Sequence, residues 1–255
     1  MARRIVPRRL SHDEEATLVE HLTELRHRLL ICIVALVPAF AIAYAFHAQL
    51  IGRLMDLVPE GTPIVTLGVT EPFTTSLKVS FYAAIALVLP ILLWQVWAFL
   101  APAVQEDTQR VLGAFVVLST ALFAAGLLFC YVIVLPRALT FLVDYDSDLY
   151  QVQIRASYYL SFVALTLLAF GIAFQMPIFV LALVRIGVLT SARLRSNRRI
   201  GYVVMLVFAI LLPTVDPVSL VLEVAPLLVL YELSIWLSVL MERRWERSAA
   251  QAEAL

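Results

Sequence analysis

The stretch Val111–Pro136 reads VLGAFVVLSTALFAAGLLFCYVIVLP and contains no charged residue. A helix rises about 1.5 Å per residue, so roughly 20 apolar residues cross the hydrocarbon core of a bilayer, which is about 30 Å thick. This uncharged stretch therefore predicts a membrane-spanning helix.

Five further runs of the same kind occur along the chain. They are Leu29–Phe46, Val79–Val104, Ala156–Val184, Ile200–Val215 and Pro217–Met241. Only the last contains charges, at Glu223 and Glu232. The chain is 62% hydrophobic with a mean hydropathy of +0.92, well above the usual composition of soluble domains. We predict an all-α polytopic membrane protein with six transmembrane helices, forming a single domain over residues 1–255.

Lysine and arginine gather on alternate connecting segments. Fifteen lie in the termini and the even-numbered loops. The other four are Arg53, Lys78, Arg137 and Arg155. By the positive-inside rule both termini are expected in the cytoplasm. Residues 1–28 then form a cytoplasmic amphipathic segment and residues 242–255 a cytoplasmic tail. Because the basic clusters flank helices and the formal net charge is zero, no nucleic-acid partner is expected.

Two features bear on processing and cofactors. No apolar run with a small-residue cleavage site precedes Leu29, so we expect no removable signal peptide. Cys32 and Cys130 fall within apolar runs and are interpreted as small apolar side chains rather than redox or metal groups. We therefore predict no cofactor and no metal.

A helix is expected to precede the first apolar run. Ser11 and Glu14 have the spacing of a capping box, which predicts a helix that begins near His12 and continues into the run. Leucines recur at helical spacing along it, so its first turns are amphipathic. Such a face can simply be solvated at the membrane surface.

The polar face of this helix carries or borders Glu20, His21, Glu24 and Arg28. Glu24 and Arg28 have the i, i+4 spacing of a favourable ion pair. His21, Glu24 and His27 are spread too far around a helix to converge on a metal ion.

The segment His21–Arg28, HLTELRHR, resembles the amino-terminal signature of the TatC family, the multispanning core of the twin-arginine protein translocase. Further motifs resemble the family in the same order. They are Glu71–Phe73, Lys78, Gln95–Ala103, Ser157–Phe162 and Ala169–Gly171. The resemblance extends from Leu18 to about Arg244.

The resemblance implies a receptor that binds twin-arginine signal peptides, recruits the single-span subunits TatA and TatB, and exports folded proteins with the protonmotive force. It implies no enzymatic activity. It also implies a concave, glove-like bundle with short helices five and six, which self-associates in the cytoplasmic membrane of a prokaryote and contacts lipid.

The resemblance also implies where the peptide binds. The implied residues are Leu22, Glu24, Leu25, Arg26, Trp97, Phe99 and Pro102. A carboxylate suits a guanidinium because charge-assisted bonds to arginine are short and directional, so Glu24 is the expected acceptor. Leu22, Leu25 and Phe99 would supply apolar contacts. Trp97 can equally be an interfacial anchor.

The chain departs from the family in its first cytoplasmic loop. Relatives usually carry a second acid where this sequence has Thr108. We assign the loop acid to Glu106, with Asp107 as the alternative, because a short loop can shift its register.

Charged side chains in the hydrocarbon cost at least about 2.5 kcal/mol each and indicate function. Glu223 and Glu232 lie about 13 Å apart along a helix, so they do not form an acid pair. The resemblance covers Glu232 but not Glu223. Gln175 stands where relatives often have glutamate, and Glu223 could supply the missing charge.

The fifth run is short, at roughly 24 Å. Pro213 and Asp216 precede the sixth run and predict a tight external turn. The resemblance makes this face the place where partner helices dock. Gln175, Glu223 and Glu232 are candidates either for that docking or for intramembrane polar groups. An ordinary helical hairpin explains the turn but not the shortness.

Two other classes of protein fit the sequence less well. A small-molecule or ion secondary transporter would show an internal repeat with matching helix breaks. Pro38, Pro90 and Pro177 interrupt runs, but without matching halves. An intramembrane enzyme would need a catalytic motif, and the sequence contains neither Gly-x-Ser-x-Gly nor His-Glu-x-x-His.

Overall fold

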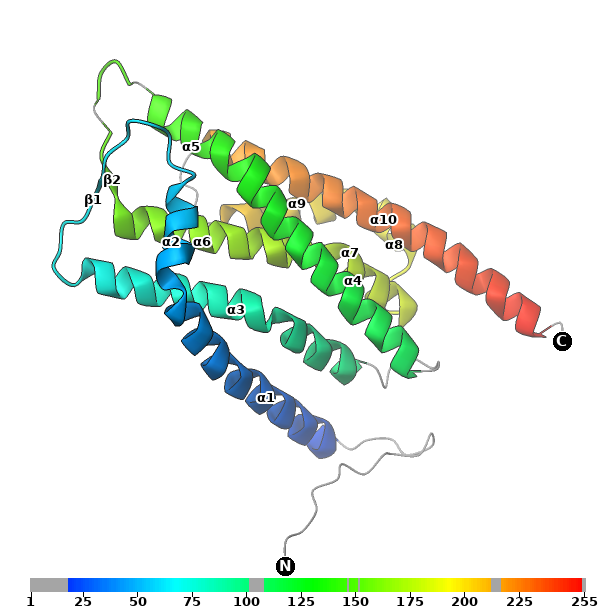
Figure 1. Cartoon of the computed structure of the whole chain (residues 1–255). Coiled ribbons are helices and arrows are strands. Elements are labelled where there is room, and N and C mark those ends of the chain that lie inside the picture. Colours follow the sequence, from blue (N-terminus) through cyan, green and yellow to red (C-terminus); the bar gives the residue numbers. More distant parts are fainter. Residues whose placement is uncertain (1–17, 101–107, 146, 151, 212–216, 254–255) are drawn as a thin grey trace, which may run out of the picture.

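The computed structural model describes residues 18–100, 108–145, 147–150, 152–211 and 217–253 (Figure 1). In chain order its helices are α1 (Leu18–Ala45), α2 (His47–Met55), α3 (Glu71–Leu100), α4 (Thr108–Phe129), α5 (Leu135–Asp144), α6 (Ala156–Ala173), α7 (Met176–Arg185), α8 (Ser191–Ser196), α9 (Arg198–Ile210) and α10 (Pro217–Glu253). Two short strands, β1 (Ile64–Val65) and β2 (Ile154–Arg155), and a π-helix, η2 (Cys130–Val134), complete these elements.

Five helical stretches of the described chain are long and apolar enough to cross a membrane. They are His21–Ala45, Glu71–Phe99, Gly113–Asp144, Ala156–Arg185 and Pro217–Glu242. Each overlaps one of the predicted runs. The prediction of an all-α polytopic membrane protein is confirmed.

The remaining predicted run corresponds to α9, which has 13 residues. A helix of that length extends about 20 Å, so the predicted shortness of helix five is confirmed. The turn residues Pro213 and Asp216 lie outside the described residues. The prediction that helix six is also short is wrong, because α10 has 37 residues. Its continuation past Met241 is rich in Glu, Arg and Ala, which are strong helix formers and give no reason to stop.

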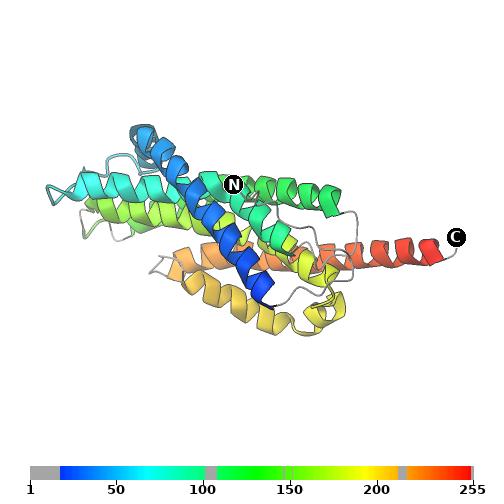
Figure 2. The same cartoon turned by 90° about the horizontal axis from the view of Figure 1, so that it is seen from below.

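The broken helix α6–α7 lies at the centre of the molecule. In its most apolar window 56% of the residues are buried inside the protein, against 11% for α1. Figure 1 accordingly shows α1 at one edge, and Figure 2 shows it crossing the face of the other helices. The exposed leucines, isoleucines and valines of α1 are the surface that lipid would cover.

Pro38, Pro90 and Pro177 were expected to interrupt apolar runs, but only Pro177 lies at a break between helices. Pro38 and Pro90 lie inside α1 and α3, and neither ends its helix. Pro177 occupies the first turn of α7, where a missing N–H costs little. Pro136 follows the π-helix η2. A proline removes a helical N–H and crowds the carbonyl four residues earlier, and the wider π turn relieves that crowding.

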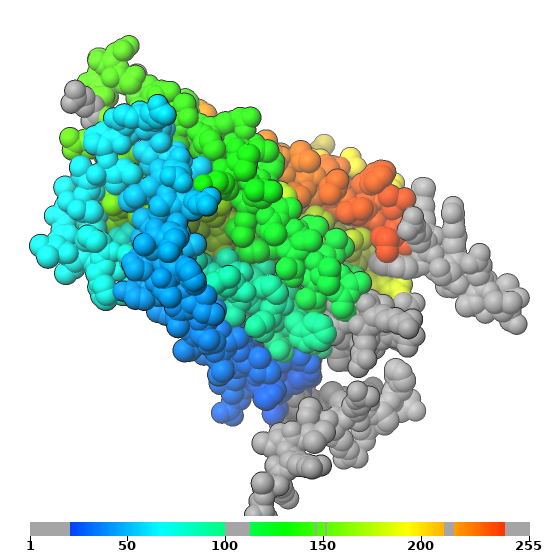
Figure 3. Space-filling model, in the orientation of Figure 1, coloured from blue at the N-terminus to red at the C-terminus, as the bar shows by residue number. Residues whose placement is uncertain are grey.

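The two ends of the molecule differ. At one end β1 and β2 pair in parallel, with Ile64 opposite Ile154 and Val65 opposite Arg155. We call this the sheet end. At the opposite end lie the start of α1, the end of α3, the start of α4 and α8, and we call this the α8 end (Figure 1). Along the molecule α1 packs against α3, with small side chains such as Ala39, Ala43 and Ala84 between them. Figure 3 shows the surfaces of α1, in blue, and α3, in cyan to teal, next to each other.

Candidate functional site

Glu24 and Arg28 form the predicted ion pair at the α8 end. The Arg28 guanidinium donates to Glu24 Oε1 from Nε at 3.0 Å and from Nη2 at 2.5 Å. The same guanidinium reaches α3, where Nη1 donates to Gln95 Oε1 and Nη2 to the carbonyl oxygen of Ala98, both at 3.2 Å. The predicted acceptor is therefore engaged with an arginine of its own chain.

Phe99 lies beside this group and is partly covered. The His21 ring stacks on it, with a centroid distance of 4.3 Å and an interplanar angle of 23°. Leu22 and Leu25 are 64% and 41% exposed, and Arg26 is exposed as well. The structure thus gathers predicted apolar and polar residues on the first turns of α1 and the last turns of α3.

Trp97 does not belong to this surface. Its side chain is 7% exposed and packs with Ile178 and Ala182, and its ring centroid lies 5.0 Å from that of Phe115. The indole Nε1 donates to Ser119 Oγ at 3.1 Å. This burial contradicts both the predicted peptide contact and the interfacial anchor. Pro102, Glu106 and Asp107 lie outside the described residues.

Gln175 occupies the break between α6 and α7. Its Nε2 donates to the carbonyl oxygen of Ser119 at 3.0 Å, so Ser119 connects both Gln175 and Trp97 to α4. Gln175 Oε1 is buried and accepts no hydrogen bond from the described residues. The predicted intramembrane polar group is therefore a link between spans with one unused acceptor.

Glu232 fastens α9 to α10. Tyr202 Oη donates to Glu232 Oε1 at 2.5 Å, and Arg198 Nη2 lies 3.2 Å from Glu232 Oε2. Gly201 faces the neighbouring Tyr231 ring so closely that any Cβ there would overlap it. Glu232 thus holds α9 and α10 together, and its side chain is 38% exposed.

Glu223 is 2% exposed. It faces the interior of the protein within the span Pro217–Glu242, which agrees with the alternative of an intramembrane polar group rather than with docking of a partner helix. The residues that flank Glu223 in α10 are apolar on every side of the helix. Their pattern therefore does not distinguish a buried face from an outer one.

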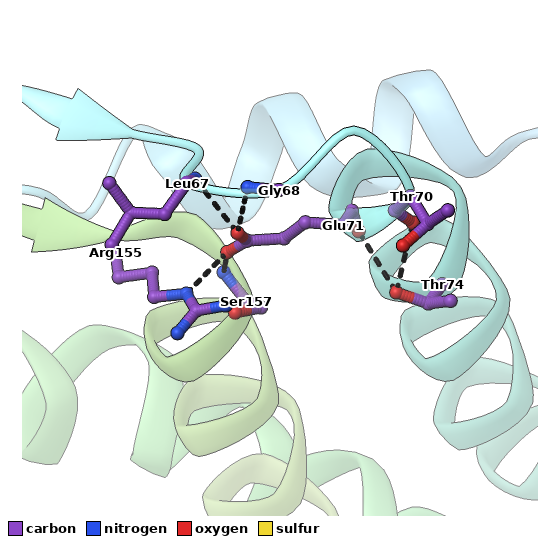
Figure 4. A network of polar contacts seen from close by, with 7 residues as sticks. All are labelled: Leu67, Gly68, Thr70, Glu71, Thr74, Arg155 and Ser157. Atoms are coloured by element: carbon purple, nitrogen blue, oxygen red, sulfur yellow. Dashed lines mark hydrogen bonds and ion pairs between the residues drawn. The ribbon is translucent and has the colours of Figure 1, made fainter.

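A second polar cluster, which sequence reasoning missed, lies at the sheet end (Figure 4). Glu71 Oε2 accepts from the backbone N–H groups of Leu67 at 2.9 Å and Gly68 at 3.2 Å. Glu71 Oε1 accepts from Arg155 Nε at 3.0 Å and from the Ser157 N–H at 3.2 Å. We call Glu71 with these four donors the Glu71 clamp.

The Glu71 clamp joins the start of α3 to the start of α6. Glu71 is 5% exposed, whereas the Arg155 side chain is 38% exposed and lies over the Tyr158 ring, 5.0 Å from its centroid. The hydrogen bond to Glu71 raises the pKa of Arg155 above its usual value. The sequence signals were an acid at the first turn of a helix, which favours the helix dipole, and the family motifs Glu71–Phe73 and Ser157–Phe162, which did not show that the two segments meet.

A family profile described as Sec-independent protein translocase protein (TatC) matches residues 20–226. The TatC protein of Magnetococcus marinus is 32% identical over 96% of this chain and 92% of the relative, and that of Escherichia coli K12 is 33% identical over 90% of each. A crystal structure of the twin arginine translocase receptor TatC in DDM superposes with a TM-score of 0.80 at 36% identity, covering 86% of this chain and 99% of that one.

The family profile, the relatives and the solved structure all identify the same family, and each match covers most of the chain. The residues matched by the family profile include the first turns of α1, the end of α3 and the Glu71 clamp. The chain is therefore a multi-pass membrane protein of the TatC family, a component of the Sec-independent protein translocase.

Proposed function

We propose that this protein is the receptor that binds twin-arginine signal peptides at the α8 end, with Glu24 as the carboxylate that meets an arginine of the peptide. The observation that carries the proposal is the pairing of Glu24 with a guanidinium. This carboxylate already holds Arg28 through Oε1, while Oε2 accepts no bond from the described residues. Its side chain is 39% exposed, so a second guanidinium can approach.

The surroundings of Glu24 suit an extended peptide with apolar residues beside its arginines. Leu22 and Leu25 are exposed on the adjoining face of α1, and the stacked rings of His21 and Phe99 border the ion pair. Burial of such apolar surface contributes about 25 cal/mol per Å² removed from water. The charged contact would orient the peptide and the apolar contacts would strengthen its binding.

A direct binding measurement tests the proposal. Purified protein in detergent should bind a fluorescent twin-arginine signal peptide and bind a peptide with two lysines at least about tenfold more weakly, because lysine lacks the planar fork that pairs with carboxylates. Equal affinity for the two peptides would show that only charge is read.

The loop acids next to α4 supply the second acceptor in this proposal. We expect Glu106→Gln to weaken peptide binding more than Asp107→Asn, and the double change to lose more than the sum, because neighbouring acids can replace each other. Adding Thr108→Glu to the double variant should restore binding. Binding by the double variant at the wild-type level would leave Glu24 as the sole acceptor.

The orientation belongs to the proposal as well. With the α8 end in the cytoplasm, both termini are cytoplasmic and the sheet end faces outward, in agreement with the fifteen-to-four distribution of basic residues. In a background with Cys32 and Cys130 changed to alanine, Gly61→Cys and Ser147→Cys should react with an impermeant thiol reagent in intact cells. Ser196→Cys should react only after lysis. All three positions are exposed, so the reverse pattern would invert the topology.

We further propose that TatA and TatB subunits dock beside α9 and α10, that the receptor self-associates in the cytoplasmic membrane, and that the protonmotive force drives export. The short α9 supports docking here, because a helix of about 20 Å leaves part of a 30 Å hydrocarbon core unmatched. The concave shape of the bundle stays a prediction. A secondary transporter is not favoured, since the one broken span of the described chain, α6–α7, has no counterpart there.

A further inference from the structure

The Arg28 guanidinium makes more contacts than an ordinary i, i+4 surface pair. It donates four hydrogen bonds to three acceptors, one on its own helix and two on α3. The acceptors on α3 are 67 and 70 residues away in sequence. The Arg28 side chain is only 21% exposed, so the group is partly shielded from water.

The contacts divide the Glu24 carboxylate into two unequal halves. Both bonds from Arg28 end on Oε1, which leaves Oε2 for a ligand. A carboxylate has about four acceptor positions, so occupation of one oxygen does not exhaust it. Because Arg28 is itself held by Gln95 and the Ala98 carbonyl, the position of Oε1 relative to α3 is fixed, and the direction of Oε2 follows from it.

We infer that Arg28, tethered by Gln95, is a positioning residue that holds Glu24 in the orientation needed to read a guanidinium. This inference rests on the proposed function, since it concerns the same site. It adds that the Arg28 tether gives the receptor its preference for arginine over lysine. A carboxylate held in one direction binds the planar guanidinium more tightly than an ammonium, whereas a freely rotating carboxylate pairs with any cation.

Simple electrostatics predicts the opposite result, which makes the inference testable. Arg28 is a cation beside the site of a dicationic ligand, and removing a like charge should tighten binding. Removing a positioning residue should weaken it. The sign of the change in affinity for Arg28→Gln therefore separates the two roles.

The experiment measures the affinities of each purified variant for twin-arginine and twin-lysine peptides. We expect Arg28→Gln to bind the twin-arginine peptide about tenfold more weakly and the twin-lysine peptide with little change, so that the preference for arginine largely disappears. Arg28→Lys should be intermediate, because an ammonium can hold Oε1 but cannot reach all three acceptors in one plane.

Gln95→Leu provides a second, independent test, because it leaves the charge of the protein unchanged. It removes one tether of Arg28 and should also reduce the preference for arginine. Matched controls are Arg193→Gln, which removes one exposed positive charge from α8, and Gln49→Leu on α2. Both should behave like the wild type. Thermal unfolding of each variant identifies any general loss of structure, which would weaken binding of the two peptides by equal factors.

Three outcomes would overturn the inference: tighter binding by Arg28→Gln, an unchanged preference for arginine in both Arg28→Gln and Gln95→Leu, or equal losses for the two peptides. Glu24→Gln separates this failure from failure of the proposed function. If Glu24→Gln binds like the wild type, the proposed site itself is wrong. If Glu24→Gln loses binding while Arg28→Gln and Gln95→Leu retain it with full selectivity, only the positioning role is wrong.

Discussion

Glu24→Ala is expected to weaken binding of a twin-arginine peptide by at least about tenfold, because a hydrogen bond between charged groups contributes about 1.5 to 3 kcal/mol and 1.4 kcal/mol corresponds to a factor of ten. The helices should remain folded. Arg28 would keep its bonds to Gln95 and to the Ala98 carbonyl, so α1 and α3 stay connected.

The measurement is a titration of labelled peptide into the purified variant, together with a photo-crosslink in membranes. Glu60→Ala is a suitable control because it removes an exposed carboxylate from the sheet end, far from the proposed site. Unchanged affinity for Glu24→Ala would mean that this carboxylate is only a solvated surface acid paired with Arg28.

Glu71→Ala is expected to destabilise the protein by about 1.5 to 3 kcal/mol, since it removes the charged acceptor of three backbone hydrogen bonds and a hydrogen bond to a charged group contributes about that much. The donors are the N–H groups of Leu67, Gly68 and Ser157. Arg155 contributes less to the loss, because its side chain is 38% exposed and can turn to water. The sheet end should open locally, and the connection between β1 and α3 should lose protection first.

Glu71→Gln separates charge from shape in the Glu71 clamp. An amide presents one acceptor oxygen and one donor nitrogen, so it cannot satisfy donors on both sides of the carboxylate. We expect a loss of stability close to that of Glu71→Ala. Thermal unfolding in detergent and hydrogen exchange of residues 64–70 measure both effects, with Glu60→Gln as the control. Wild-type exchange in both variants would show that the strand pairing holds this end without Glu71.

The sequence predicted those features that depend on neighbours along the chain. Apolar runs identified the spans because hydropathy is summed locally, and the spacing of Glu24 and Arg28 predicted their ion pair. Nothing local indicated that Gln95 and Ala98 share the same guanidinium. The Glu71 clamp was missed for the same reason, because Arg155 and Ser157 are 84 and 86 residues away.

The two tryptophans near the end of α3 show a second limit. Trp94 and Trp97 are both amphipathic rings near the end of a span, and either suits an interface by composition. Trp94 is 46% exposed and fits an anchor, whereas Trp97 is buried against α4 and α7. Only the packing of the helices decides between them, and α3 is apolar on nearly all sides, so periodicity carried no information about its faces.

The π-helix η2 is a place where its span can lose one residue without changing which side chains of the span face inward. A π turn accommodates an extra residue, and one residue corresponds to about 100° of rotation in an α-helix. Loss of a residue from Cys130–Val134 would return the span to a continuous α-helix with the same side chains still facing inward, at the cost of crowding by Pro136. A deletion in α4 would instead turn the buried Leu135 and Leu139 toward lipid. Lineages that differ in length by one residue here can therefore share one arrangement of the core.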